Sequence, residues 1–262
     1  MWNTLFRSFS GDEQAHGYFP TVARYGANMT PEDMYHGTRL AAAEALNSGM
    51  TTVHDWCHNI RSREFAERDL AALTEAGIRA RFSYGWAQGQ DDKDPLNIAD
   101  IEALHRDWSK HSNDGLITLG LGWRGMFRAG PLPENVYRSE FEAARTMGIP
   151  ITVHIASRKT APNQIEAHAK AKLLGKDVQL VQLRPGKRAD IIMVNTRALN
   201  MGGFVDPAHL LVGSALPENV DTVIIAGRIL KQSGKLTALS ASQVVAEARS
   251  ALEGVRKRTK WR

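Results

Sequence analysis

The stretch Pro150-Ile151-Thr152-Val153-His154-Ile155-Ala156 decides the fold class of this chain. It is an apolar, β-branched run that carries a histidine and is followed by the polar residues 157–160. A continuous apolar run is typical of a strand covered on both faces, as in a parallel sheet. In a (β/α)8 barrel, a histidine at the carboxyl end of a strand points into the mouth where chemistry takes place. A buried histidine bonded to a backbone group explains the same pattern.

The order of helix, glycine and apolar strand recurs along the first two thirds of the chain. The predicted helices cover 30–48, 64–76, 97–110, 135–147 and 162–174, and the predicted strands cover 50–56, 78–85, 116–123, 150–156 and 178–181. Such alternation predicts repeated βα units and a parallel sheet. Five strands are fewer than the eight that close a barrel. We therefore predict an α/β fold built on an incomplete TIM-type (β/α) barrel.

The pattern changes after residue 182. Short strands are predicted at 189–194 and 221–230, and Ala226-Gly227-Arg228 within the second stretch predicts a hairpin turn. A predicted helix runs from Ser240 to about Arg256. We predict a partial barrel domain at 1–182. At 183–262 we predict a small C-terminal β-sandwich module that ends in a helix.

The composition narrows the class of protein. The 262 residues are 43% hydrophobic and 23% charged, which is typical of a soluble globular chain. No apolar run approaches the ~18 residues of a membrane span, and residues 1–7 lack the pattern of a signal peptide. Cys57 is the single cysteine, so no intramolecular disulfide can form. We expect a cytoplasmic protein with no membrane partner.

Part of the net charge of +5 lies in the basic run 256–262. Basic tails of this kind contact nucleic acid in some proteins, but they are more often solvated helix ends whose cations complement the helix dipole. No recognition motif accompanies the charge. We therefore do not expect nucleic acid as a partner.

Three segments in the right order, 49–55, 148–154 and 184–192, together with a closing hairpin at 220–228, resemble one known family. The chain resembles the amidohydrolase superfamily, in its branch of cytosine deaminases, chlorohydrolases and S-adenosylhomocysteine deaminases. The resemblance implies a barrel with a β-sandwich made from both chain ends. It also implies a divalent metal, zinc or iron, that activates water. The implied function is metal-dependent hydrolysis or deamination of a C–N bond in a small heterocyclic substrate.

The ligand set that the resemblance implies is matched only in part. The family uses a His-x-His pair after the first strand, a histidine ending each of the fifth and sixth strands, and an aspartate ending the eighth. His154 matches the fifth-strand ligand, whereas Ser157 stands at the position of the proton-shuttling glutamate and Gln182 at the sixth-strand histidine. Residues 1–7 resemble the segment after the His-x-His pair, and 183–187 the segment after the eighth unit. We therefore expect the isolated chain to be inactive or weakly active.

His58 is the candidate that would rebuild a metal site together with His154, because the barrel mouth brings these strand ends towards each other. In a regular strand, His54 and Trp56 share one face and Asp55 takes the other. His54 and Asp55 therefore cannot both point into the barrel.

Trp86, Trp123 and Arg124 follow strand ends and are candidates for lining a substrate pocket. Ordinary aromatic packing at the sheet edge is the more frequent use of such residues. A non-catalytic, truncated or degenerate family member with a scaffold, binding or oligomerisation role is the alternative function. A partial barrel leaves strand edges at 50–56 and 178–181 unpaired, so we also expect self-association.

Overall fold

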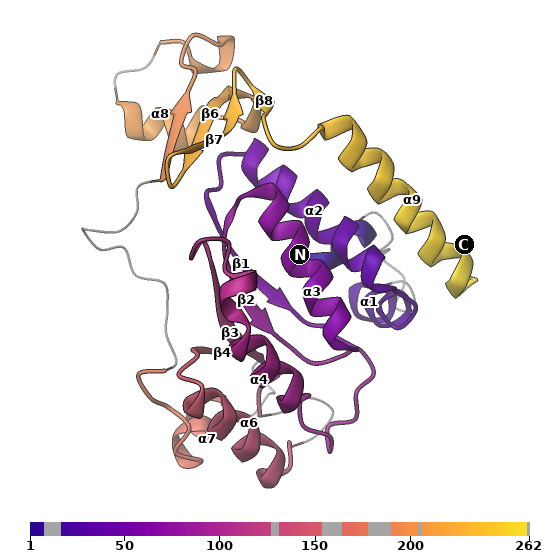
Figure 1. Cartoon of the computed structure of the whole chain (residues 1–262). Helices are drawn as coiled ribbons and strands as arrows, with labels where there is room; N and C mark the ends of the chain where they lie inside the picture. Colours follow the sequence, from indigo (N-terminus) through magenta and orange to yellow (C-terminus); the bar gives the residue numbers. More distant parts are fainter. Residues whose placement is uncertain (8–16, 127–130, 154–163, 178–189, 204–205, 261–262) are drawn as a thin grey trace.

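The computed structural model describes residues 1–7, 17–126, 131–153, 164–177, 190–203 and 206–260 (Figure 1). Within these residues the chain forms a four-stranded parallel sheet and a four-stranded antiparallel sheet. The predicted strand 178–181 and the predicted domain boundary at 182 lie outside the described residues.

The parallel sheet is the partial barrel that the sequence predicts. Its strands, in spatial order, are β1 (Thr52–Cys57), β2 (Arg79–Tyr84), β3 (Ile117–Trp123) and β4 (Ile151–Val153). Every neighbouring pair is parallel, and the register places Asp55 beside Phe82 and Phe82 beside Leu119. At the described end of the sheet, the N–H of Ile151 donates to the carbonyl of Asp177 at 3.0 Å. The α/β prediction is confirmed.

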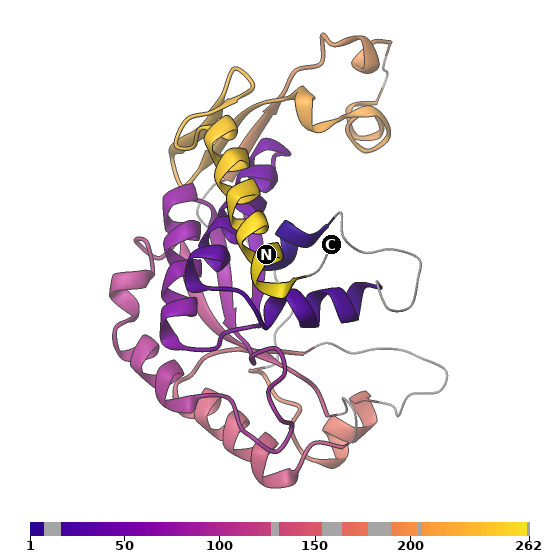
Figure 2. The same ribbon diagram turned by 90° about the vertical axis from the view of Figure 1, so that its right-hand side faces the viewer.

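Helices precede, separate and follow the strands, and those between the strands cover one face of the parallel sheet (Figure 2). They are η1 (Trp2–Phe6), α1 (Tyr18–Gly26), α2 (Pro31–Asn47), α3 (Arg63–Ala76), α4 (Ile98–Arg106), α5 (Trp108–His111), α6 (Glu134–Thr146) and α7 (Gln164–Lys170). Figure 2 shows α3, α4 and α6 following one another along one side of the sheet. Strand residues on that side, such as Cys57, Phe82 and Leu121, are almost completely buried against the helices.

Local signals explain where these helices begin and end. The α2 start is a capping box, in which the Thr30 hydroxyl accepts from the Asp33 N–H at 3.2 Å and the Thr30 N–H donates to Asp33 Oδ2 at 2.7 Å. The single helix predicted at 97–110 is two helices, because Asp107 leaves the helical conformation at ψ 13°. The helix predicted at 162–174 ends at Lys170, since Lys172 turns to φ +56°.

The second sheet is antiparallel and lies in the C-terminal part of the chain. Its order is β5 (Asp190–Val194), β6 (Val220–Ile225), β7 (Arg228–Gln232) and β8 (Lys235–Leu236). Ala226 and Gly227 make the predicted hairpin turn, with φ of +49° and +82°. Between β5 and β6 lie η3 (Leu199–Met201), α8 (Pro207–Ser214) and η4 (Pro217–Asn219).

The C-terminal helix α9 (Ala241–Thr259) returns to the barrel helices and lies along α2 (Figure 1). Arg258 on α9 forms an ion pair with Asp33 on α2. The buried ammonium of Lys231 on β7 donates to the carbonyl of Asn47, at the end of α2, at 2.6 Å. The second sheet and α9 are therefore both fastened to α2. No helix among the described residues is long and apolar enough to cross a membrane.

Candidate functional site

The carboxyl ends of β1 and β2 bring together two of the predicted site residues, His58 and Trp86. The His58 ring stacks on the Trp86 ring at a centroid distance of 5.3 Å and an interplanar angle of 29°. The ring of Trp2 meets His58 edge-on at 5.2 Å, and the ring of Trp56 meets Trp86 edge-on at 6.5 Å. We call Trp56, His58 and Trp86 the aromatic mouth.

Backbone hydrogen bonds join the segment after β1 to the segment after β2, and these two segments carry the aromatic mouth. The Gly85 N–H donates to the Cys57 carbonyl at 2.8 Å, and the Asn59 N–H donates to the Trp86 carbonyl at 2.6 Å. A Cβ at Gly85 would lie 3.0 Å from the Cys57 carbonyl, a tight contact that glycine avoids. Asn59 takes φ +84°, and its amide bonds to the Gly26 carbonyl at 2.9 Å.

The face of the parallel sheet opposite the helices carries His54, Trp56 and Ser83. His54 Nε2 lies 2.8 Å from the Ser83 hydroxyl, and the His54 and Trp56 rings stack at 6.3 Å. On β3, a side chain at Gly122 would lie 2.7 Å from Trp56 Nε1. As predicted, His54 and Trp56 share this face while Asp55 takes the other, where it is fully buried.

Trp123 and Arg124, at the end of β3, are held by one buried carboxylate. Trp123 Nε1 donates to Glu140 Oε2 at 2.6 Å, and Arg124 Nη2 donates to Glu140 Oε1 at 2.8 Å. Arg124 also donates to the carbonyl of Asp94 at 2.5 Å, and the N–H of Leu96 donates to Glu140. Burial raises the pKa of Glu140, and the charge of Arg124 opposes that rise. These contacts fix the loop before α4; that either residue touches a substrate stays a prediction.

His154, Ser157 and Gln182 lie outside the described residues. The role of His154 as a metal ligand, and its pairing with His58, therefore stay predictions. His58 itself is half-buried, with its Nδ1 3.4 Å from the Trp56 carbonyl.

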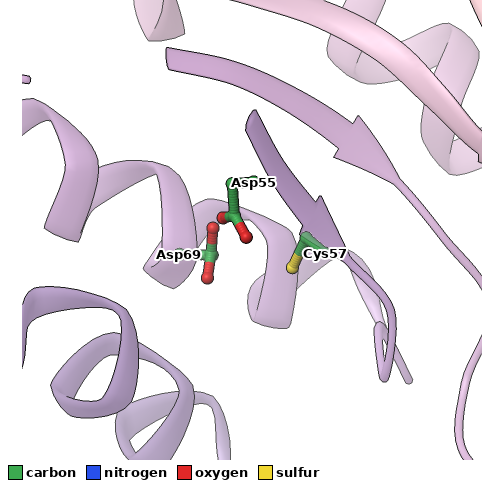
Figure 3. Close-up of side chains that lie close together, drawn as sticks. All are labelled: Asp55, Cys57 and Asp69. Carbon is green, nitrogen blue, oxygen red and sulfur yellow. The ribbon is translucent and has the colours of Figure 1, made fainter. Parts of the chain in front are cut away.

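A second group of chemically active side chains lies on the helix-covered face, and sequence reasoning missed it. Asp55 and Cys57 project from β1 towards Asp69 on α3 (Figure 3). One ligand atom from each of the three lies within 4.8 Å of the others, and all three residues are 0% exposed. The signal in the sequence was Asp69 itself, which falls on the apolar stripe of α3 with Ala66 and Leu73.

Charges and hydrogen bonds surround this group. The Met1 amine donates to Asp55 Oδ1 at 2.9 Å, and the Thr38 hydroxyl donates to Asp69 Oδ1. Burial and the neighbouring charge of Asp55 raise the pKa of Asp69 well above its usual range. Burial also raises the pKa of the Cys57 thiol. Burial alone would raise the pKa of Asp55 too, but the charge of the Met1 amine and the hydrogen bond with Asp69 outweigh it and lower that pKa.

Comparison with known proteins explains this architecture. The pattern of the amidohydrolase family matches residues 5–172 of the chain. The chain belongs to the amidohydrolase family. The resemblance inferred from segments 49–55 and 148–154 is thereby confirmed.

Curated relatives of this amidohydrolase are deaminases of adenosine derivatives. A 5-methylthioadenosine/S-adenosylhomocysteine deaminase of Natronomonas pharaonis is 34% identical over 158 residues, which cover 58% of this chain and 33% of the relative. A 5'-deoxyadenosine deaminase of Methanoregula boonei is 30% identical over 176 residues, covering 57% of this chain and 38% of the relative. The chain thus spans about a third of the length of these relatives.

Solved structures share the fold. An adenosine deaminase from Xanthomonas campestris with bound zinc superposes with a TM-score of 0.77 at 15% identity, covering 98% of this chain and 83% of that chain. An atrazine chlorohydrolase from Arthrobacter aurescens, complexed with zinc, gives a TM-score of 0.63 at 13% identity, covering 84% of this chain and 77% of that chain. At these identities the likeness shows the fold alone.

The family implies a metal, and the residues at the mouth of this amidohydrolase decide whether one fits there. A catalytic zinc site needs three protein ligands and an open position. Within the described residues, the single group of three potential ligands close enough to hold an ion is Asp55, Cys57 and Asp69, on the opposite face of β1. The described part of the mouth therefore does not by itself fit a catalytic metal, and we derive no catalytic step through one.

Proposed function

We propose that this chain binds a flat nitrogen heterocycle of the adenosine type at the aromatic mouth, and that its amidohydrolase activity is hydrolytic deamination, weak in the isolated chain. In that reaction water adds at the ring carbon that bears the amino group, and ammonia leaves. The observation that carries the proposal is the stacking of His58 on Trp86 beside the carboxyl ends of β1 and β2. Ligands of barrel folds bind at this end of the strands.

The chemistry of the mouth suits such a ligand. The half-buried rings of Trp56 and His58 lie against the buried ring of Trp86, at centroid distances of 6.5 and 5.3 Å from it. Aromatic stacking adds about 1–3 kcal/mol per base in nucleic-acid complexes and tolerates different bases. The curated relatives carry names of deaminases of adenosine derivatives, which supports this ligand class for the family member described here.

The first experiment measures ligand binding and ammonia release separately. Adenosine and 5'-deoxyadenosine are titrated into the full chain while tryptophan fluorescence is recorded, with Trp86→Ala as the test variant. Trp108→Ala, on α5, is the control, because its ring contacts His111 instead of the mouth. We expect saturable binding that Trp86→Ala weakens about tenfold, equal to about 1.4 kcal/mol. Binding that is absent, or equal in both variants, would contradict the proposed site.

The second candidate function is that of a binding scaffold without turnover. It is favoured by one observation: no group of three potential metal ligands lies at the described part of the mouth. Ammonia release with and without added Zn²⁺ decides between the two functions. Release that depends on the metal supports the deaminase, whereas binding without any release supports the scaffold.

A further inference from the structure

The buried group on the helix side of β1 is separate from the aromatic mouth. Because successive side chains of a strand alternate, Asp55 and Cys57 point away from the face that carries His54 and Trp56. Asp69 reaches the same spot from the middle of α3 (Figure 3). The three side chains thus lie between β1 and α3, behind the sheet as seen from the mouth.

Two carboxylate oxygens in this group accept no hydrogen bond from an N–H or hydroxyl group of the described residues, and the hydrogen bonds left to these side chains run between Asp55, Asp69 and Cys57 themselves. Asp55 Oδ1 is bonded to the Met1 amine and Asp69 Oδ1 to the Thr38 hydroxyl, but Oδ2 of each aspartate is buried and has no such donor. Figure 3 shows the two carboxylates pointing towards each other, with the Cys57 sulfur nearby. Two acceptors and a thiol therefore converge in a place that water does not reach.

Burying acceptors of this kind is costly unless something compensates their charge. The Met1 ammonium compensates the charge of one carboxylate. A proton shared by the two carboxyl groups, or a divalent cation, compensates the other. Zinc and cobalt accept a cysteine sulfur at ~2.3 Å and carboxylate oxygens at ~2.0–2.2 Å. Three ligands around one such ion lie within roughly 4.5 Å of one another, and the ligand atoms of Asp55, Cys57 and Asp69 all lie within 4.8 Å of one another. Magnesium and calcium prefer oxygen ligands throughout.

We propose that Asp55, Cys57 and Asp69 form a zinc-type metal site that fastens β1 to α3. Asp55 Oδ2, Asp69 Oδ2 and the Cys57 thiolate are the three protein ligands, and the Thr38 hydroxyl, already bonded to Asp69, offers a further oxygen. The ion displaces the protons of the thiol and of the carboxyl pair. Because the site is closed to solvent and lies behind the sheet, its role is structural.

Cobalt(II) is the probe, because a cobalt–thiolate bond gives a charge-transfer absorption that oxygen and imidazole ligands do not give. The full chain is titrated with Co²⁺ and then with Zn²⁺, and the thermal unfolding midpoint is recorded for each state. We expect one equivalent of Co²⁺, a thiolate band that Zn²⁺ abolishes, and a rise in the unfolding midpoint, since an ion bound to the folded state stabilises it.

Two variants and one control make the result specific. Cys57→Ser removes the thiolate band, and Asp69→Asn weakens Co²⁺ binding by at least tenfold. His58→Ala at the mouth leaves both unchanged. The absence of a thiolate band in the folded wild-type chain would overturn the proposal and leave the shared proton as the compensation. Stabilisation by Zn²⁺ that survives Cys57→Ser but is lost in His58→Ala would also overturn it, and would place the metal at the mouth.

Discussion

Arg79 and Asp190 form a two-pronged ion pair that joins the two sheets. Nε and Nη2 of Arg79 donate to the two carboxylate oxygens of Asp190, each at 2.8 Å. Arg79 is the first residue of β2 and Asp190 the first of β5. The pair therefore anchors the second sheet at the amino ends of the parallel strands. The carboxyl ends, with the aromatic mouth, lie at the opposite end of the sheet.

Replacing Asp190 is expected to weaken this anchor. Asp190→Asn removes the charge from two hydrogen bonds and weakens a third, from the N–H of Ala226 at 3.2 Å. Hydrogen bonds to charged groups contribute about 1.5–3 kcal/mol, so the free energy of unfolding should fall by about that amount. Urea denaturation measures it. Arg79→Lys keeps the positive charge but cannot form two parallel hydrogen bonds, so it should lower the free energy of unfolding less than Asp190→Asn does. Equal losses in the two variants would contradict the role of the bidentate geometry.

The same pair gives the chain a defined acid sensitivity. Burial alone would raise the pKa of Asp190, but the hydrogen bonds from Arg79 and Ala226 outweigh it and hold that pKa below its ordinary value of 3.8. A lowered pKa means that the stabilisation is complete above 3.8 and is lost as the pH falls through the folded value. Urea midpoints between about pH 5 and about pH 3 should therefore fall less in Asp190→Asn than in the wild type. If the urea midpoints of the variant and the wild type fell equally with pH, Asp190 would not be the source of the acid sensitivity.

Replacing Glu140 is expected to lower the free energy of unfolding more than most single substitutions do. Its side chain and that of Arg124 are both 0% exposed, and Glu140 also accepts from Trp123 and Leu96. Glu140→Gln leaves a guanidinium buried without its counter-charge, which costs about 3–5 kcal/mol. Chemical denaturation tests this. Glu134→Gln, in an exposed pair with Arg138, is the matched control and should cost less than about 0.5 kcal/mol.

The βα alternation was predictable because each strand is a compact apolar run and glycine ends several of the helices. Gly77, at φ +69°, closes α3 where the sequence places a stop. The hairpin at Ala226-Gly227 was predictable for the same local reason. What the pattern did not reveal is the docking of α9 on α2, because it depends on the pair between Arg258 and Asp33, far apart in the sequence.

The sequence predicted candidate site residues from their positions after strands, but it did not predict their contacts with helix residues. His58 and Trp86 were singled out because each follows a strand, and parallel register brings such ends together. The use of Trp123 and Arg124 around Glu140 was not visible, since Glu140 reaches them from a helix face. The meeting of Asp69 with Asp55 and Cys57 likewise depends on how α3 packs against β1. Tertiary packing of this kind leaves no local pattern.

Gly122 is expected to be intolerant of any side chain. A methyl group there would lie 2.7 Å from Trp56 Nε1 and 3.2 Å from the Ser83 carbonyl. Gly122→Ala should lower the free energy of unfolding by about 1–3 kcal/mol, the usual cost of overpacking, and should displace Trp56 in the aromatic mouth. Near-ultraviolet circular dichroism and ligand titration report both effects. Gly213→Ala, on α8, where no atom lies within 4 Å, should leave Trp56 in place and should not lower the free energy of unfolding, because alanine favours a helix more than glycine does.

We propose that the chain associates with itself through an unprotected sheet edge. At the described edge of the antiparallel sheet, β5 leaves Ile191, Ile192 and Met193 between 44% and 53% exposed, so both of its faces are partly exposed. The strand has no lysine or proline of the kind that protects edges. Ile192→Lys should therefore lower the oligomer fraction in sedimentation velocity at micromolar concentration.

The matched control for the edge is Ile165→Lys, on α7, where an isoleucine of similar exposure lies outside any sheet. If association is driven by general apolar exposure, both lysines reduce it equally. If it uses the β5 edge, only Ile192→Lys does so, because a charge on an edge strand opposes the approach of a second strand. A wild-type chain that sediments as a sharp monomer would refute self-association altogether.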